Sequence, residues 1–208
     1  MAQRAQENKS AKRRGLIKAA RALFLQDGLR DATVDAIARR AGIAKGTFYL
    51  YFNDKYELME QVALEFALEL LDEAQECAQR EDSLLDGIER AIDYLLERFA
   101  RRPRLMRLME CDFPWQLLRR QMDLDPNNPA RRLLNACCAA PEMARIPREE
   151  VYRRLVLAAQ LAGAAARGAL LSGQPAPLDQ LKPLIFDCVR KILSQAASSD
   201  GNAQLARD

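Results

Sequence analysis

Lys45, Gly46 and Thr47 stand together in a short segment that also holds Tyr49 and Tyr51. A lysine can donate to the O6 and N7 acceptors of guanine, and a threonine can donate to a phosphate or lay its methyl group against that of thymine. The glycine has no side chain, so the backbone there can approach a sugar-phosphate strand closely. Each tyrosine is a flat group whose terminal hydroxyl suits a base edge or a phosphate. The segment therefore has the chemistry of a DNA contact.

Two flanking positions extend this chemistry. Lys55 follows the segment and is placed for a phosphate, and the free amides of a helix that begins at Thr33 favour an anion. Singly, a tyrosine is as well explained by packing and a lysine by solvation, so these residues count as a set. The candidate DNA-contact residues are Thr33, Lys45, Gly46, Thr47, Tyr49, Tyr51 and Lys55.

Two short helices must position this set. Val34 and Ile37 recur at helical spacing after a capping threonine, and Gly42 ends that helix. Phe48 and Phe52 then mark the buried side of a second short helix, which leaves its polar side exposed. Residues 33–52 thus have the outline of a helix-turn-helix, whose second helix enters the major groove of DNA.

Charge is distributed unevenly along the chain. Residues 1–56 carry 12 basic and 5 acidic side chains, a net charge of +7, and residues 57–208 carry a net charge of −4. A basic head on an acidic body indicates a polyanionic partner for the head alone. Its leader (Arg4, Lys9, Lys12, Arg13 and Arg14) either follows phosphates and the minor groove or is a disordered, solvated tail.

The remainder of the chain reads as all-α, because no segment shows sustained period-two alternation. The small-residue-rich stretch 155–171 is too interrupted by polar side chains for a membrane span and is expected to be a buried helix. Residues 114–147 are broken by prolines and give no clear pattern. Helices are expected at 12–26, from Asp54 to about Leu70, at 83–101, from Pro103, and at 148–172 and 177–196.

Several classes of function are disfavoured by composition. Histidine is absent, which removes the common catalytic dyads and His-ligated metals, so we expect no enzyme, metal or cofactor. Five cysteines without a C-x-x-C pair, and a charged N-terminus without an apolar core, indicate a cytoplasmic protein with reduced thiols and no membrane partner. Adjacent Cys137 and Cys138 read better as small buried hydrophobes than as a redox switch.

Residues 14–58 strongly resemble the DNA-binding domain of TetR-family transcriptional regulators. The resemblance rests on Ala20–Phe24, Gly28, Thr33-Val34-x-x-Ile37-Ala38 and Ala41-Gly42-Ile43, and on Lys45-Gly46-Thr47-Phe48-Tyr49-x-Tyr51-Phe52-x-x-Lys55-x-x-Leu58. Two positions depart from the family pattern. Ala44 stands where serine or threonine often caps the recognition helix, and Tyr51 stands where histidine is common.

The resemblance implies an N-terminal three-helix helix-turn-helix domain (residues 1–56), a helical effector-binding and dimerisation domain (57–198) and a C-terminal tail (199–208). It also implies that the protein is a homodimer and that DNA is touched by the positions of Thr33, Lys45, Thr47, Tyr49, Tyr51 and Lys55. The last two long helices suit such an interface, because small side chains crowd the first of them. The second contributes Leu178, Leu181, Ile185, Val189 and Ile192, although the same residues also fit an intramolecular core.

Aromatic and methionine side chains in the body suggest an adaptable apolar pocket for an apolar or aromatic effector, although each fits the core equally well. The candidate effector residues are Tyr94, Met106, Met109, Phe113, Trp115, Met122 and Tyr152. The sequence therefore predicts a regulator, most simply a repressor, that a small-molecule effector releases from a palindromic operator. The alternative is a DNA-bound scaffold that recruits a protein partner and has no small-molecule effector.

Overall fold

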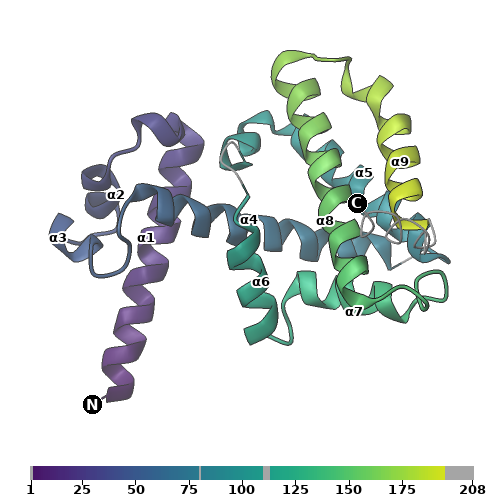
Figure 1. Ribbon diagram of the computed structural model, residues 1–208. Helices are drawn as coiled ribbons and strands as arrows, with labels where there is room; N and C mark the ends of the chain where they lie inside the picture. Colours follow the sequence, from purple (N-terminus) through teal and green to yellow (C-terminus); the bar gives the residue numbers. More distant parts are fainter. Residues whose placement is uncertain (1, 80, 110–112, 195–208) are drawn as a thin grey trace, which may run out of the picture. The chain divides into compact units, whose positions relative to one another are not determined.

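The computed structural model describes residues 2–79, 81–109 and 113–194, and this part of the chain is helical without any strand (Figure 1). The predicted all-α class is confirmed. The chain divides into two compact units, Met1–Leu70 with Arg102–Leu124 and Leu71–Arg101 with Asp125–Asp208. The first unit therefore extends beyond the domain boundary expected after residue 56 and recruits a later segment of the chain.

The first unit contains the predicted helix-turn-helix. Its first helix is longer than expected and includes the basic leader, which is helical in this structure. Gly28 interrupts that helix with a φ of 82°, a left-handed value that glycine adopts without strain. The elements are α1 (Ala2–Asp31), α2 (Val34–Arg40), α3 (Lys45–Phe48), the first part of α4 (Lys55–Ala78), η1 (Pro103–Met109) and α6 (Trp115–Leu124).

One hydrophobic core holds these helices together. Leu16 and Phe24 of α1, Ile37 of α2 and Phe48 of α3 are fully buried, as the apolar spacing predicts. The expected stripe of α4 is buried as well, namely Leu58, Met59, Val62, Phe66 and Leu70. The segment η1 packs against α1, so residues from much later in the chain join the core of the first unit.

The second unit contains the end of α4, α5 (Leu84–Arg101), α7 (Pro129–Ala139), α8 (Arg148–Arg167), the π-turn η2 (Gly168–Ser172) and α9 (Leu178–Ser194). Helices α8 and α9 run side by side in opposite directions, and α7 packs against α8 (Figure 1). Gly168 lies where α8 passes into η2. A Cβ atom there would stand 2.5 Å from the carbonyl oxygen of Gln174, so the close return of the chain requires glycine.

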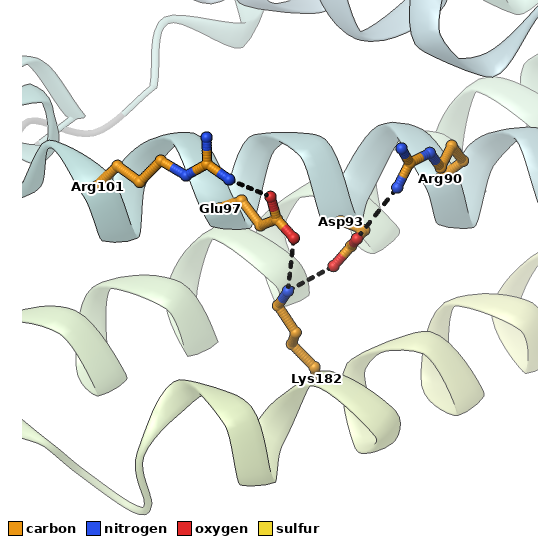
Figure 2. A network of polar contacts seen from close by, with 5 residues as sticks. All are labelled: Arg90, Asp93, Glu97, Arg101 and Lys182. Atoms are coloured by element: carbon orange, nitrogen blue, oxygen red, sulfur yellow. Dashed lines mark hydrogen bonds and ion pairs between the residues drawn. The ribbon is translucent and has the colours of Figure 1, made fainter.

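Ion pairs join α5 to α9. The Lys182 ammonium on α9 lies 2.5 Å from Asp93 and 3.7 Å from Glu97 on α5, and Arg90 and Arg101 flank the same carboxylates (Figure 2). Two turns further along α9, Arg190 binds Asp86 and Glu89 of α5. These contacts set the register between the two helices, and the more exposed pairs, such as those of Arg190, each contribute only about 0–1 kcal/mol.

The proline-rich stretch contains two helices that the sequence pattern did not predict, α6 and α7. Asn128 caps α7 by accepting hydrogen bonds from the amides of Ala130 and Arg131 at 3.0 and 3.4 Å. Pro129 occupies the first turn, where its missing amide hydrogen costs nothing. An Asn-Pro pair before an apolar stretch was therefore a start signal rather than a break.

The expectation of a buried helix at 155–171 is wrong. Arg148–Ser172 is long and apolar enough to cross a membrane by length and composition, yet only 17% of its most apolar window is buried. The inner face, with Val151, Ala158 and Ala162, packs into the unit. Leu157 and Leu171 lie on the exposed side, because the neighbouring helices cover one face of α8 only.

Cys137 behaves as the sequence predicts for a small buried hydrophobe, because its side chain is fully buried in α7. Burial, with a smaller contribution from neighbouring Cys138, raises the pKa of the Cys137 thiol to about 12. Cys188 on α9 is exposed. Cys111 lies outside the described residues.

We predict that a thiol reagent at pH 8 leaves the buried Cys137 unmodified in the native protein, and Cys188, which is exposed on the single chain, is the second site to follow. The reactive species is the thiolate, whose fraction at a pH about 4 below the pKa is on the order of 1 in 10,000. Peptide mass spectrometry after labelling measures both sites. Labelling in urea is the control, since unfolding should expose Cys137, and rapid native labelling of Cys137 would contradict the prediction.

Candidate nucleic-acid interface

The interface begins at the start of α2. Thr33 has an extended backbone and its Oγ1 accepts a hydrogen bond from the amide of Ala36 at 3.1 Å, so the predicted helix cap is confirmed. Its side chain remains exposed at the positive end of α2, where a phosphate is electrostatically favoured. Gly42 then turns the chain toward α3 with a φ of 70°, and the amide of Ile43 donates back to the carbonyl of Ala38 at 3.0 Å.

Aromatic packing fixes the orientation of α3. Phe48 is fully buried, and its ring centroid lies 5.3 Å from that of Tyr49 in an edge-on arrangement and 5.9 Å from that of Phe52. With these two phenylalanines inside, Lys45 and Gly46 are left on the exposed side of the helix. The buried pair therefore presents the polar side of α3 to solvent, as the spacing predicts.

Two large side chains that directly follow α3 are exposed. The side chains of Tyr49 and Leu50 are 54% and 73% exposed, whereas those of Thr47 and Tyr51 are half-buried. Leu50 was not in the predicted contact set. A large exposed apolar side chain between two tyrosines was the available signal, because such a group can contact a thymine methyl in the major groove.

Within the described residues, Ala44 starts α3 without a side-chain cap. We predict that Ala44→Ser stabilises the protein by about 0.5–2 kcal/mol, because a serine hydroxyl can accept one of the free amide hydrogens of the first turn. Urea unfolding of the two proteins measures the difference. Ala44→Val is the control, since valine supplies no acceptor and is as poor a cap as alanine, and equal stability of the serine variant and the parent would contradict the prediction.

Two of the basic residues that the sequence analysis singled out are held by contacts within the unit. Arg13 of the leader donates to Oε1 of Gln61 at 3.0 Å and lies over the ring of Phe52, so its guanidinium supports α4. The ammonium of Lys55 lies 3.0 Å from the carbonyl oxygens of Leu29 and Arg30 and 3.2 Å from that of Ala32. The structure thus gathers Lys45 to Tyr51 on one short segment and shows Lys55 bound to backbone.

The predicted effector residues are divided between the two units. Met106, Phe113, Trp115 and Met122 belong to the first unit. Met106 and Met122 are buried there, and the rings of Phe113 and Trp115 pack against each other at an interplanar angle of 60°, with centroids 4.5 Å apart. The side chain of Met109 lies outside the described part of the structure.

Tyr94 and Tyr152 belong to the second unit. The Tyr94 hydroxyl donates to Glu73 at 2.7 Å and accepts from Arg98 at 2.9 Å, and the carboxylate raises the pKa of Tyr94. A cavity of about 10 Å³ between α5 and α9 has room for roughly one water molecule and is lined by none of the predicted residues. The effector pocket therefore stays a prediction.

Comparison with known proteins agrees with this geometry. Residues 16–62 match the family model described as bacterial regulatory proteins, tetR family. The chain is 44% identical over 50 residues to the transcriptional regulator SrpR of Pseudomonas putida, which is 24% of both chains. It is 40% identical over 63 residues to the transcriptional regulator BetI of Escherichia coli, which is 30% of this chain and 32% of BetI. These matches span about a quarter to a third of the curated relatives.

Solved structures extend the likeness to most of the chain. A TetR family regulator from Marinobacter aquaeolei aligns with a TM-score of 0.55 and 19% identity, over 90% of this chain and 97% of its own. SmeT, the repressor of the Stenotrophomonas maltophilia efflux pump SmeDEF, aligns with a TM-score of 0.54 and 20% identity, over 86% and 88%.

The exposed short helix after a glycine turn, within an all-α fold, defines a helix-turn-helix DNA-binding domain. Residues 16–62 form a DNA-binding domain of the TetR family of bacterial regulatory proteins.

Proposed function

We propose that the protein is a repressor that binds a palindromic operator as a homodimer and is released by a small-molecule effector. The observation that carries DNA recognition is the exposed polar side of α3, held outward by buried Phe48 and Phe52. In this proposal Lys45 and Tyr49 reach base edges in the major groove, and Thr33 and Tyr51 bind phosphates. Gly46 and Thr47 allow α3 to approach the sugar-phosphate backbone of the DNA closely.

Apolar surface on α8 and α9 supports the homodimer. Leu157 and Leu184 are 55% and 60% exposed, and Leu157, Ala164 and Leu171 recur every seven residues along α8 and η2. Exposed apolar stripes on helices are typical of interaction surfaces. The predicted α9 residues Leu181, Ile185 and Val189 instead face the interior, so a partner copy would meet the opposite side of α9.

A dimer explains how so short a helix reads DNA selectively. Two recognition helices held about 34–36 Å apart enter successive major grooves and read the two halves of a palindrome. A change in that separation weakens both half-site contacts together. Coupling of this kind is typically worth about 1–3 kcal/mol, which corresponds to roughly 5- to 150-fold in affinity.

The packing of η1 on α1 supports effector control. Met106 in η1 is a predicted effector residue and is buried in the same core as α1. A ligand that displaces this side chain would shift the segment against the first helix of the DNA-binding unit. Buried methionines are adaptable in this way, and the aromatic pair Phe113–Trp115 suits an apolar or aromatic ligand. We propose that this regulation takes place in the cytoplasm.

Fluorescence anisotropy of the purified protein tests DNA recognition. The probes are a duplex from upstream of its own gene and a scrambled duplex, and both are measured at one near-physiological salt concentration because phosphate contacts depend on salt. Tight binding to the native duplex alone supports the proposal, and a binding-site selection from random duplexes covers operators that lie elsewhere. Equal, weak binding to native, scrambled and selected DNA would overturn sequence-specific recognition.

The same assay then tests effector release. Addition of apolar and aromatic compounds to the complex should lower the anisotropy when one of them binds. A protein that retains its operator with every compound and captures a protein partner instead would support a DNA-bound scaffold.

A further inference from the structure

Lys55 occupies a position that ordinary helix electrostatics disfavours. It is the first residue of α4, where the helix end carries partial positive charge and acidic residues are preferred. The neighbouring residues follow that preference. Asp54 accepts hydrogen bonds from the amides of Tyr56 and Glu57, both at 2.8 Å, and Glu57 accepts from the amide of Asn53 at 2.7 Å. Contacts within α4 therefore do not explain why a lysine stands at this position.

The contacts of the Lys55 side chain explain its position, and they are made with the segment between α1 and α2. The Lys55 ammonium donates to the carbonyl oxygens of Leu29, Arg30 and Ala32 at 3.0, 3.0 and 3.2 Å. An ammonium group has three hydrogens, so these contacts use all of them. The last carbonyls of a helix lack partners within it and carry its negative partial charge, which makes them good acceptors for a cation.

These carbonyls belong to the corner between α1 and α2. The left-handed Gly28 interrupts α1 just before them, and Ala32, which is buried, directly precedes Thr33, the cap of α2. One side chain therefore joins the start of α4, the end of α1 and the start of α2. Because α2 packs against α3, the position of α2 also sets that of the recognition helix.

We infer that Lys55 is a positioning residue, which orients α2 and α3 by binding the α1–α2 corner rather than a DNA phosphate. The inference rests on the proposed DNA recognition. It departs from the phosphate contact that the sequence predicts for Lys55, and the two roles differ in a measurable way. A phosphate contact contributes to the salt dependence of binding, whereas a positioning contact within the protein does not.

The test compares Lys55→Met and Lys55→Arg with the parent in operator binding over a range of salt concentrations. We expect Lys55→Met to weaken operator binding about tenfold, with an unchanged slope of log K against log salt. Lys55→Arg should fail to restore affinity, because a planar guanidinium cannot direct three hydrogens to one set of converging carbonyls. A slope reduced by about 0.9 per subunit, restored together with affinity by arginine, would establish the phosphate contact and overturn the inference. Unchanged affinity of Lys55→Met would also overturn it.

A second measurement uses the full-length protein without DNA. In ¹⁵N-detected spectra of the lysine ammonium groups, Lys55 should exchange its hydrogens with water far more slowly than exposed Lys18 does. Equal exchange rates would overturn the inference even where the methionine variant fails to fold. A parent protein that binds no duplex selectively would refute the proposed function alone, because slow ammonium exchange does not depend on DNA.

Discussion

Replacing Leu184 with glutamate is expected to separate the two copies of the protein and to lower its affinity for the operator by about a hundredfold or more. Leu184 lies on the exposed side of α9, opposite the residues that pack inside the unit. A carboxylate there would be removed from water at the interface without a partner, which is strongly unfavourable. Once the dimer separates, each recognition helix binds its half-site alone and the gain from simultaneous binding is lost.

Sedimentation velocity measures the oligomeric state of the variant, and anisotropy measures its affinity at the same protein concentration. Leu124→Glu is the matched control, because Leu124 is 84% exposed but lies on α6 in the first unit. That change should leave both measurements unaltered. A Leu184→Glu protein that sediments as the parent dimer would show that this side of α9 is not the interface, and a monomeric parent would refute the dimer itself.

The DNA-binding helices were predictable because their signals are local. Thr33 caps α2 through its own side chain, Gly42 supplies the left-handed turn, and Phe48 and Phe52 are one helical turn apart. Each of these features depends on residues close in sequence. The placement of α3 and of its exposed side followed from them without knowledge of the remaining chain.

Other features depend on tertiary contacts and could not be predicted in this way. Lys55 looks like a solvent-facing cation until the carbonyls of Leu29 and Arg30, about 25 residues earlier, are seen beside it. On α9, helical spacing identifies an apolar stripe but does not show which neighbour covers it. From the sequence alone, Leu181 and Ile185 fit an interface between two copies or the core of one copy equally well. In the structure, α8 and α5 pack against α9 and bury both residues within one copy.

Lys45 connects the local pattern to base recognition. We predict that Lys45→Ala weakens operator binding by about 1–3 kcal/mol, or roughly 5- to 150-fold, and relaxes the preference at one base pair of each half-site. The ammonium stands at the start of α3 on its exposed side, and within the described residues it makes no hydrogen bond or ion pair of the kind that holds Lys55. It is therefore available for a guanine edge in the major groove.

Operators in which single guanines are replaced by 7-deazaguanine test the contact directly, because this analogue lacks the N7 acceptor. The parent protein should lose affinity at one position, whereas Lys45→Ala should be indifferent to the same replacement. If Lys45 binds a phosphate instead, its removal should weaken binding to all duplexes equally and reduce the salt slope by about 0.9 per subunit. Since each half-site presents one α3, a specific contact should appear twice, related by the two-fold symmetry of the operator.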